Sequence, residues 1–333
     1  MIHPIPPGSR DVLPDEMREL RRLNRALIEV FEARGYGEVA TPTIEYDEVL
    51  ARGGGPDTQS AYRFFDESGE LLALRSDMTV PIARLAASRF AGTEPPLRLC
   101  YLASAYRAVR PQRGQMREFV QAGVELIGAP APEGTVEVIE VLEAALDAAG
   151  LDRAVIGLGD SDLYRQLLTE FGIEGETRDS LLARLAEHDI VGLETELAEV
   201  PGISDQQTAT CIALSQLRGG SEVLEEARKL GGEAVQRATS QLQATYETLA
   251  ERGGADRVQI DLGLLRDLGY YSGAILEVYD PALGHVLGGG GRYDGLMKRF
   301  GLDLPAAGFA LYLERVHVAQ MEEESRERGE PDG

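Results

Sequence analysis

Two strand-like runs on either side of a short charged stretch constrain the fold of this chain more than any other feature. LRLCYLASAYR (residues 97–107) and REFVQAGVELIG (117–128) are rich in aliphatic, aromatic and β-branched residues, and AVRPQRGQM (108–116) separates them. Extended runs joined by so short a connection are typical of a β-hairpin. The sequence therefore predicts a long antiparallel hairpin.

The second run of this hairpin alternates in character with the period of a β-strand. One predicted face carries only apolar residues, namely Val120, Ala122, Val124 and Leu126. The other face carries Phe119, Gln121, Gly123 and Glu125, which place polar groups on either side of a gap. The apolar face predicts a core, whereas the polar face has two interpretations: a half-exposed sheet with Gln121 and Glu125 in water, or the wall of a binding site.

The order of the remaining elements indicates an α+β fold. An amphipathic helix is expected from about Asp15 to Gly35, and extended segments, a short helix and the hairpin follow it. Residues 175–250 are polar, helix-patterned and free of strand signals, which predicts a helical insertion. Strand signals return after it, so we expect a core made of residues 1–174 and 251–322. Residues 323–333 are predicted to form a solvated acidic tail.

Composition excludes several classes of function. The 333 residues carry a formal net charge of −23, which opposes binding to nucleic acid or to an anionic membrane. No apolar run approaches the ~18 residues that span a bilayer, and the N-terminus does not read as a secretion signal. Cys100 and Cys211 are expected to be reduced core thiols of a cytoplasmic protein. The cysteines and histidines lack zinc-site spacing, so we expect no metal and no cofactor.

A tract of four glycines, Gly288–Gly291, invites comparison with phosphate-binding loops. A dinucleotide fingerprint needs a third glycine at the sixth place, which is Tyr293 or Asp294 here, and the chain contains no Gly-Lys-Ser/Thr. Two interpretations remain open: a flexible turn between strands, or a backbone that passes close to a ligand.

Five stretches of the sequence together resemble one known family. They are PPGSRDVLP, LRSDMT, YRAVRPQRGQMREFVQAGVELIG, LLRDLGYYSGAILE with GGGGRYDGL, and PAAGFALYLER. In this order they resemble the catalytic domain of class II histidyl-tRNA synthetases across nearly the whole chain. The resemblance implies an antiparallel sheet flanked by helices, with an amino-acid pocket on one face.

The resemblance also implies residues for the backbone groups of a bound histidine. The ammonium would be met by Asp77, Thr79 and Gln121, which supply oxygen acceptors. The carboxylate would be met by Arg107 and Arg266. Asp77 stands where the family usually has a longer glutamate.

The histidine side chain would be recognised by a carboxylate and a group of tyrosines. An imidazole needs a partner at each nitrogen. Glu125 and Tyr271 match the family positions that read the ring, and Tyr270 and Tyr293 support them. Gly269 replaces an aspartate that precedes these tyrosines in the family.

The part of the site that would bind ATP departs from the family pattern. Val109 stands in place of a glutamate that helps to hold ATP, and Gln115 replaces an arginine that faces phosphate. Tyr312 replaces a glycine that leaves room for adenine, so a phenol would crowd the nucleotide. Arg315 is retained. These residues predict a degraded nucleotide end beside an intact amino-acid end.

A family with this description is the regulatory subunit of ATP phosphoribosyltransferase, which resembles the synthetase domain without its anticodon-binding domain. The resemblance implies a non-catalytic protein of histidine biosynthesis. Its partner would be the short-form catalytic subunit, and L-histidine would be its feedback effector. We also expect a homodimer within a larger hetero-oligomer, because the first helix and VATPTIEY occupy the family's dimer-forming motif.

Two other functions remain open at this point. The first is a ligase that activates an amino acid with ATP for an acceptor other than tRNA; Arg107, Arg266 and Arg315 favour it, while Val109, Gln115 and Tyr312 oppose it. The second is an assembly scaffold in which the pocket is vestigial.

Overall fold

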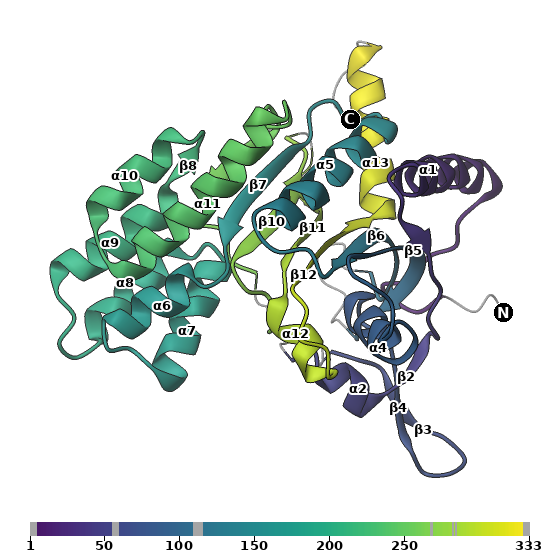
Figure 1. The fold of residues 1–333 in the computed structure, drawn as a ribbon, viewed down its shortest axis with the longest axis horizontal. Helices are drawn as coiled ribbons and strands as arrows, with labels where there is room; N and C mark the ends of the chain where they lie inside the picture. The colour runs from purple at the N-terminus through teal and green to yellow at the C-terminus, as the bar shows by residue number, and fades with distance from the viewer. Residues whose placement is uncertain are drawn as a thin grey trace.

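A nine-stranded sheet organises the computed structural model, which describes residues 5–54, 60–108, 116–266, 269–281, 283 and 285–328 (Figure 1). In spatial order its strands are β1 (Gly37–Glu38), β5 (Leu97–Tyr106), β6 (Glu118–Ile127), β12 (Ala306–Tyr312), β11 (Val286–Arg292), β10 (Ala274–Tyr279), β7 (Val155–Asp160), β9 (Val258–Asp261) and β8 (Arg218–Gly219). The pairs β1–β5 and β7–β9 are parallel and the other neighbouring pairs are antiparallel. The α+β prediction is confirmed, although the sheet is mixed rather than purely antiparallel.

The long hairpin forms as predicted from the two strand-like runs. β5 and β6 pair without a register shift from Leu97 opposite Ile127 to Tyr106 opposite Glu118. Ala122, Val124 and Leu126 are fully buried, so the expected apolar face is the core face. The polar face is buried as well, because Gln121 is 3% exposed and Glu125 is 1% exposed. The interpretation that leaves these two side chains in water is therefore wrong.

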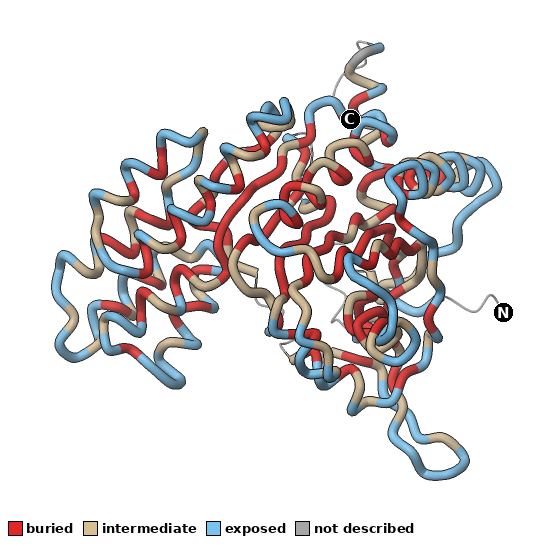
Figure 2. Tube along the Cα trace, in the orientation of Figure 1, coloured by how far each residue is buried: buried red, intermediate tan, exposed pale blue. Residues whose placement is uncertain are grey.

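Three helices cover the apolar face of the sheet: α1 (Pro14–Ala33), α5 (Glu133–Ala148) and α13 (Leu313–Glu327) (Figure 1). α1 buries residues at helical spacing, and Phe31 meets Phe309 of β12 edge to face with ring centroids 5.9 Å apart. The burial of such a stripe against a sheet accounts for the helix position. The main core lies between these helices and the sheet and continues among the helices that follow β7 (Figure 2).

A group of helices extends from the β7 side of the sheet. It consists of α6 (Leu163–Glu170), α7 (Gly175–Ala186), α8 (Ile190–Glu199), α9 (Asp205–Gln216), α10 (Glu222–Leu230) and α11 (Glu233–Glu251). α11 contacts α5 and α6 and so joins this group to the rest of the molecule. The segment is not free of strand, since β8 pairs with β9 and forms the edge of the sheet. β8 is only two residues long and one of them is a glycine, so the sequence there carries no recognisable strand signal.

The C-terminal helix is longer than the sequence indicated. α13 continues to Glu327, into residues that were expected to form a solvated tail. Glu323 is 7% exposed, and its carboxylate accepts the backbone N–H groups of Asp152 at 3.0 Å and Arg153 at 3.1 Å. From sequence alone this run of glutamates is expected to be solvated, because the loop that Glu323 binds lies 170 residues away in the chain. Among the described helices, none is both long and apolar enough to cross a membrane.

A second, three-stranded sheet projects from the body below the main one (Figure 1). It is built from β2 (Ile44–Tyr46), β4 (Leu71–Leu74) and β3 (Arg63–Phe65), with α2 (Asp47–Ala51), α4 (Thr79–Arg89) and α12 (Asp294–Arg299) nearby. The segment that leads from β4 into α4 is LRSDMT, so this sheet places the predicted ammonium-binding residues against the polar face of the hairpin.

Candidate functional site: an amino-acid pocket on the polar face of the sheet

The four-glycine tract is the middle of the central strand β11. A Cβ added to Gly288 would lie 2.4 Å from the carbonyl oxygen of Ala310, and one added to Gly290 would lie 2.0 Å from that of Gly308. Real side chains do not approach backbone so closely, so only glycine fits. The interpretation of the tract as a flexible turn is wrong. The groups that its backbone approaches are neighbouring strands, and its approach to a ligand stays a prediction.

Strand register places small residues side by side on the polar face. Gly123 of β6 pairs with Ala310 of β12, which pairs with Gly289 of β11. Larger side chains lie over this floor, since a Cβ on Gly123 would be 2.6 Å from the Tyr101 hydroxyl and one on Gly289 would be 1.6 Å from Nη1 of Arg266. The missing side chains create a hollow in the middle of the sheet.

This hollow, which we call the inner pocket, brings the predicted histidine-binding residues together. Eight of the nine line it: Asp77, Thr79, Arg107, Gln121, Arg266, Tyr270, Tyr271 and Tyr293. The ninth, Glu125, is hydrogen-bonded to two of them. Residues from five separate parts of the chain therefore converge on one site.

Glu125 is buried behind the residues that line the inner pocket. Thr79 donates its hydroxyl to Oε1 at 2.8 Å, and the Tyr293 hydroxyl donates to Oε2. Burial raises the pKa of Glu125 from its ordinary 4.5 to about 8, although the two hydrogen bonds act in the opposite direction. A carboxylate oxygen accepts more than one hydrogen bond, so Glu125 can still receive an N–H from a ligand.

The raised pKa of Glu125 predicts a specific pH dependence of stability. Because the folded protein favours the protonated carboxyl, this contribution to stability is complete below about pH 4.5 and is lost as the pH rises through about 8. We expect the free energy of unfolding of the wild type, relative to Glu125→Gln, to fall by a few kcal/mol across that window. Urea unfolding of both proteins at a series of pH values measures the difference between their free energies of unfolding. The contributions of the other titratable groups are the same in both proteins and cancel. A flat difference curve would contradict this account.

Three tyrosines form an aromatic wall next to Glu125. Tyr270 packs edge to face against Tyr271, with ring centroids 5.0 Å apart, and against Tyr293 at 6.0 Å. Burial raises the pKa of Tyr271 well above its ordinary range, so the hydroxyl stays protonated and can donate a hydrogen bond. An imidazole is a planar ring that needs a hydrogen-bond partner at each nitrogen. Aromatic side chains next to a carboxylate and tyrosine hydroxyls meet both needs.

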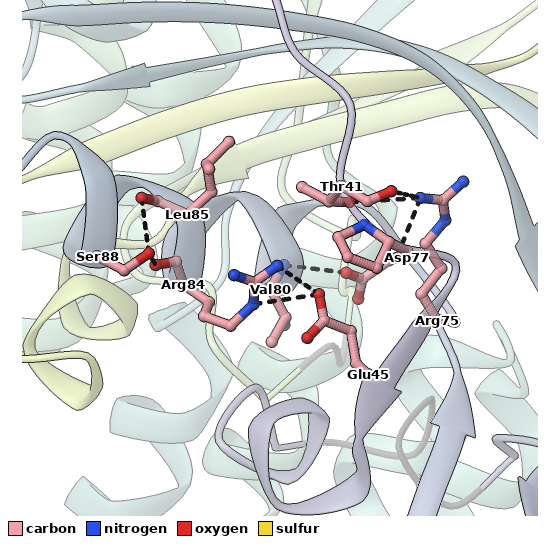
Figure 3. Close-up of polar contacts among 9 residues, drawn as sticks. Thr41, Glu45, Arg75, Asp77, Val80, Arg84, Leu85 and Ser88 are labelled. Carbon is pink, nitrogen blue, oxygen red and sulfur yellow. Dashed lines mark hydrogen bonds and ion pairs between the residues drawn. The ribbon is translucent and has the colours of Figure 1, made fainter.

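The loop that carries Asp77 is held by a buried arginine (Figure 3). Arg75 donates to the carbonyl oxygens of Thr41 and Ser104, each at 2.7 Å, and so fixes the exit from β4. Asp77 follows at the start of α4, where Oδ1 accepts the backbone N–H of Val80 at 3.1 Å (Figure 3). The carboxylate is thus positioned by backbone contacts on both sides.

Gln121 offers a second acceptor to the inner pocket. Its Oε1 is buried and has no hydrogen-bond partner among the described residues. A buried polar atom without a partner costs free energy, commonly ~1–3 kcal/mol, and such atoms are usually satisfied by water or by a ligand. Together with Asp77, Gln121 provides an electronegative end suited to an ammonium group.

Two arginines also line the inner pocket. Arg266 lies across Gly289 and donates Nη1 to the carbonyl oxygens of Leu276 at 3.3 Å and Gly288 at 3.4 Å. Burial lowers the pKa of Arg266, but the neighbouring Tyr271, Tyr312 and Glu277 raise it by more, so the guanidinium is firmly charged. Arg107 donates Nε to the Ser76 carbonyl at 3.2 Å. Both cations are placed where a carboxylate could bind.

The free space at the centre of the inner pocket is small. It amounts to about 30 Å³, which is about the space that one water molecule takes up. A histidine molecule is several times larger, so it enters only if lining side chains swing outward. Arg266 is held by two long hydrogen bonds and by an ion pair with Glu277 at 3.9 Å, contacts that an outward swing of its side chain would have to break.

A second cavity adjoins the first at Tyr312, the residue that the sequence predicted to crowd a nucleotide. We call it the outer cleft; it measures about 400 Å³, and Arg107 and Tyr312 line both cavities. The Tyr312 ring packs against Phe119 at 5.4 Å and is covered by Arg315 at 4.6 Å. Tyr312 thus separates the two cavities without filling the outer one. Val109 and Gln115 lie outside the described residues.

The sequence did not single out two residues that shape the inner pocket. Tyr101 is 1% exposed and covers Gly123, and Gly308 gives room to Glu125, since a Cβ there would lie 2.0 Å from Oε2. Tyr101 shares a face with Gln121 and Glu125 through the pairing of β5 with β6. Only the hairpin register reveals this, and the connecting loop does not fix that register from sequence alone.

Comparison with known proteins agrees with this geometry. The sequence profile of the histidyl-tRNA synthetase family matches residues 8–316. The ATP phosphoribosyltransferase regulatory subunit of Moorella thermoacetica is 41% identical over 320 residues, which cover 96% of this chain and 82% of that protein. The chain belongs to the family of ATP phosphoribosyltransferase regulatory subunits. It is thus assigned to histidine biosynthesis as a regulatory, non-catalytic subunit.

Solved structures show that this regulatory subunit is similar in fold to a histidyl-tRNA synthetase. The crystal structure of an ATP phosphoribosyltransferase regulatory subunit/histidyl-tRNA synthetase from Bacillus halodurans superimposes with a TM-score of 0.87 at 32% identity, covering 99% of this chain and 92% of that one. The histidyl-tRNA synthetase of Nostoc sp. PCC 7120 superimposes with a TM-score of 0.79 at 22% identity, covering 100% of this chain and 77% of that one. The second likeness shows a shared fold.

Proposed function

We propose that this regulatory subunit binds free L-histidine in the inner pocket and transmits feedback inhibition to the catalytic subunit of ATP phosphoribosyltransferase. The observation that carries the proposal is the unpartnered, buried Oε1 of Gln121 in a cavity that two arginines also line, with Glu125 held by the hydroxyls of Tyr293 and Thr79. Acceptors for an ammonium, cations for a carboxylate and a planar polar slot for an imidazole meet within one cavity.

The small size of the inner pocket supplies a route for regulation. Histidine has to displace lining side chains to enter, and two of the lining residues, Arg107 and Tyr312, also border the outer cleft. A ligand changes a conformational equilibrium only by its difference in affinity for the two states. Couplings of roughly 1–3 kcal/mol are typical, which corresponds to several-fold to hundredfold changes in the partner's affinity or activity.

Calorimetry on the isolated protein tests the pocket, with L-histidine and ATP titrated separately. We expect histidine to bind and ATP not to bind. Addition of histidine to the complex reconstituted with the purified catalytic subunit should then lower its transferase rate. If histidine fails to bind, the inner pocket is not the sensor. Binding of ATP, together with histidine-dependent exchange of pyrophosphate into ATP, would favour the amino-acid-activating ligase, which the retained Arg315 and the open outer cleft permit.

A homodimer within the larger complex is part of this proposal, and one face of the small sheet supports it. Tyr46 pairs with Leu72, and Leu72 with Phe64, so these side chains form one apolar row. Tyr46 is 50% exposed, and Ile44 in the next row is 46% exposed. A monomer rarely leaves such a cross-strand apolar surface in water.

The dimer proposal predicts a difference between the two faces of that sheet. Tyr46→Glu should dissociate the homodimer by placing a charge in an apolar interface. Phe65→Glu is the matched control, because Phe65 is 71% exposed and lies on the opposite face. Sedimentation velocity of the isolated subunit measures the outcome. Dimers that persist in the first variant, or dissociate equally in both, would assign the interface elsewhere.

A cytoplasmic location also belongs to the proposal. Cys100 and Cys211 are both buried free thiols, as expected from the sequence, and a reducing compartment suits them.

A further inference from the structure

The outer cleft combines positive charge with an apolar rim. It is lined by Arg10, Arg107 and Arg315 against only two acidic side chains, Glu16 and Glu314. Glu16 is paired with Arg10, and both oxygens of Glu314 accept the Val120 N–H, at 3.1 and 3.2 Å. The Arg10–Glu16 pair is neutral within itself, which leaves Arg107 and Arg315 against Glu314. The cleft is locally cationic in a chain whose net charge is −23.

Its apolar rim continues along the exposed side of α13. Val318 borders the cleft and is 48% exposed, and Met321, one helical turn further on, is 44% exposed. Residues three apart lie on the same face of a helix, so the two form a short apolar stripe. Large apolar side chains exposed in a contiguous row indicate an interaction surface.

The aromatic rings of the cleft are poorly placed to stack a nucleotide base. Arg107 covers the Phe119 ring at 5.0 Å, the edge of Phe119 meets Tyr312, and Arg315 covers Tyr312 at 4.6 Å. The ring faces that a base would use are therefore engaged by guanidinium groups. What the cleft still offers is cationic charge next to an apolar stripe that runs beyond the cavity.

We infer that the outer cleft, with the exposed face of α13, docks an extended segment of the catalytic subunit that carries carboxylates beside an apolar anchor residue. The inference rests on the proposed function, because it assigns the partner's contact in the same regulatory complex. Carboxylates complement the arginines, and the anchor packs on Val318. Because Arg107 and Tyr312 also line the inner pocket, displacement of these side chains by histidine reaches the docked segment directly.

A pair of double variants tests this docking site. Val318→Glu with His285→Glu adds negative charge at two exposed positions of the cleft. Val191→Glu with Gln206→Glu is the matched control, since it also adds two negative charges at exposed positions, on α8 and α9 of the helical segment, where Val191 is 76% exposed. The dissociation constant for the purified catalytic subunit is measured by calorimetry at low and high salt, and histidine binding is measured on each variant alone.

We expect the cleft variant to bind the catalytic subunit at least ~10-fold more weakly and the control to stay within about twofold. Histidine affinity should be unchanged in both, and wild-type affinity should fall with salt. Equal weakening in the two variants, or none in either, overturns the docking site while leaving the proposed function intact. If the wild type does not bind the catalytic subunit, the proposed function fails as well. ATP binding that the cleft variant abolishes would overturn the inference in favour of a nucleotide site.

Discussion

Replacement of Glu125 by Gln should weaken histidine binding by about 100-fold while the protein still folds. At neutral pH the buried Glu125, with a pKa of about 8, is largely protonated, so a glutamine of the same shape replaces it at little cost to stability. On binding, the imidazole N–H donates to this side chain, and only a carboxylate gives a charge-assisted hydrogen bond. Loss of that charge costs ~1.5–3 kcal/mol, or roughly 10- to 100-fold in affinity, and burial favours the upper end.

The same substitution should remove a pH dependence. A donor from the ligand stabilises ionised Glu125, so binding releases a proton and wild-type affinity rises towards the pKa near 8. The Gln variant cannot respond in this way. Calorimetry in two buffers of different ionisation enthalpy measures the released proton. The control is Glu118→Gln, an exposed carboxylate on the same strand, which should leave affinity and proton release unchanged.

The effect on regulation follows from the effect on binding. In the reconstituted complex, Glu125→Gln should shift the histidine concentration needed for inhibition by a similar factor, with the uninhibited rate retained. Tyr271→Phe, which removes one hydroxyl from the slot, should act in the same direction with a smaller shift. Undiminished inhibition in both variants would place the feedback site outside the inner pocket.

Periodicity and family motifs predicted the parts of this molecule in which local sequence and tertiary contacts agree. The hairpin β5–β6 could be predicted because Ala122, Val124 and Leu126 alternate with polar residues and the core lies on one side. α1 could be predicted because its apolar residues recur at helical spacing. The nine candidate residues could be named because each lies in a motif, and they meet because those motifs border one face of one sheet.

Features that depend on contacts between residues far apart in the sequence could not be predicted. Glu323 looks solvated in sequence, yet it binds the loop at Asp152 and Arg153. β8 exists because an edge strand was available to pair with two residues that have no strand propensity of their own. Whether Gln121 and Glu125 were wet or buried depended on Arg266 and the tyrosines, which arrive from much later in the chain.

A substitution within the four-glycine tract is expected to have the second large effect, which is a loss of stability. A Cβ at Gly290 would lie 2.0 Å from the Gly308 carbonyl oxygen, 2.7 Å from Cα of Phe309 and 2.8 Å from Cβ of Phe309. Two of these atoms are backbone of the neighbouring strand β12, which is also held by β6 and cannot yield without loss of hydrogen bonds. We expect Gly290→Ala to destabilise the fold by at least about 3 kcal/mol, the upper range for overpacking in a rigid core.

Gly295→Ala is the matched control for that change. Gly295 lies within α12, just after the strand that carries the tract, and a Cβ there would meet no atom within 4 Å. Alanine in a helix is favoured over glycine by ~0.5–1 kcal/mol, so this variant should be neutral or slightly more stable. The midpoints of urea unfolding for the two variants should therefore move in opposite directions. Equal midpoints would mean that β12 can shift to accept a side chain, in which case the floor of the inner pocket is not the rigid surface that fixes Glu125 above Gly308.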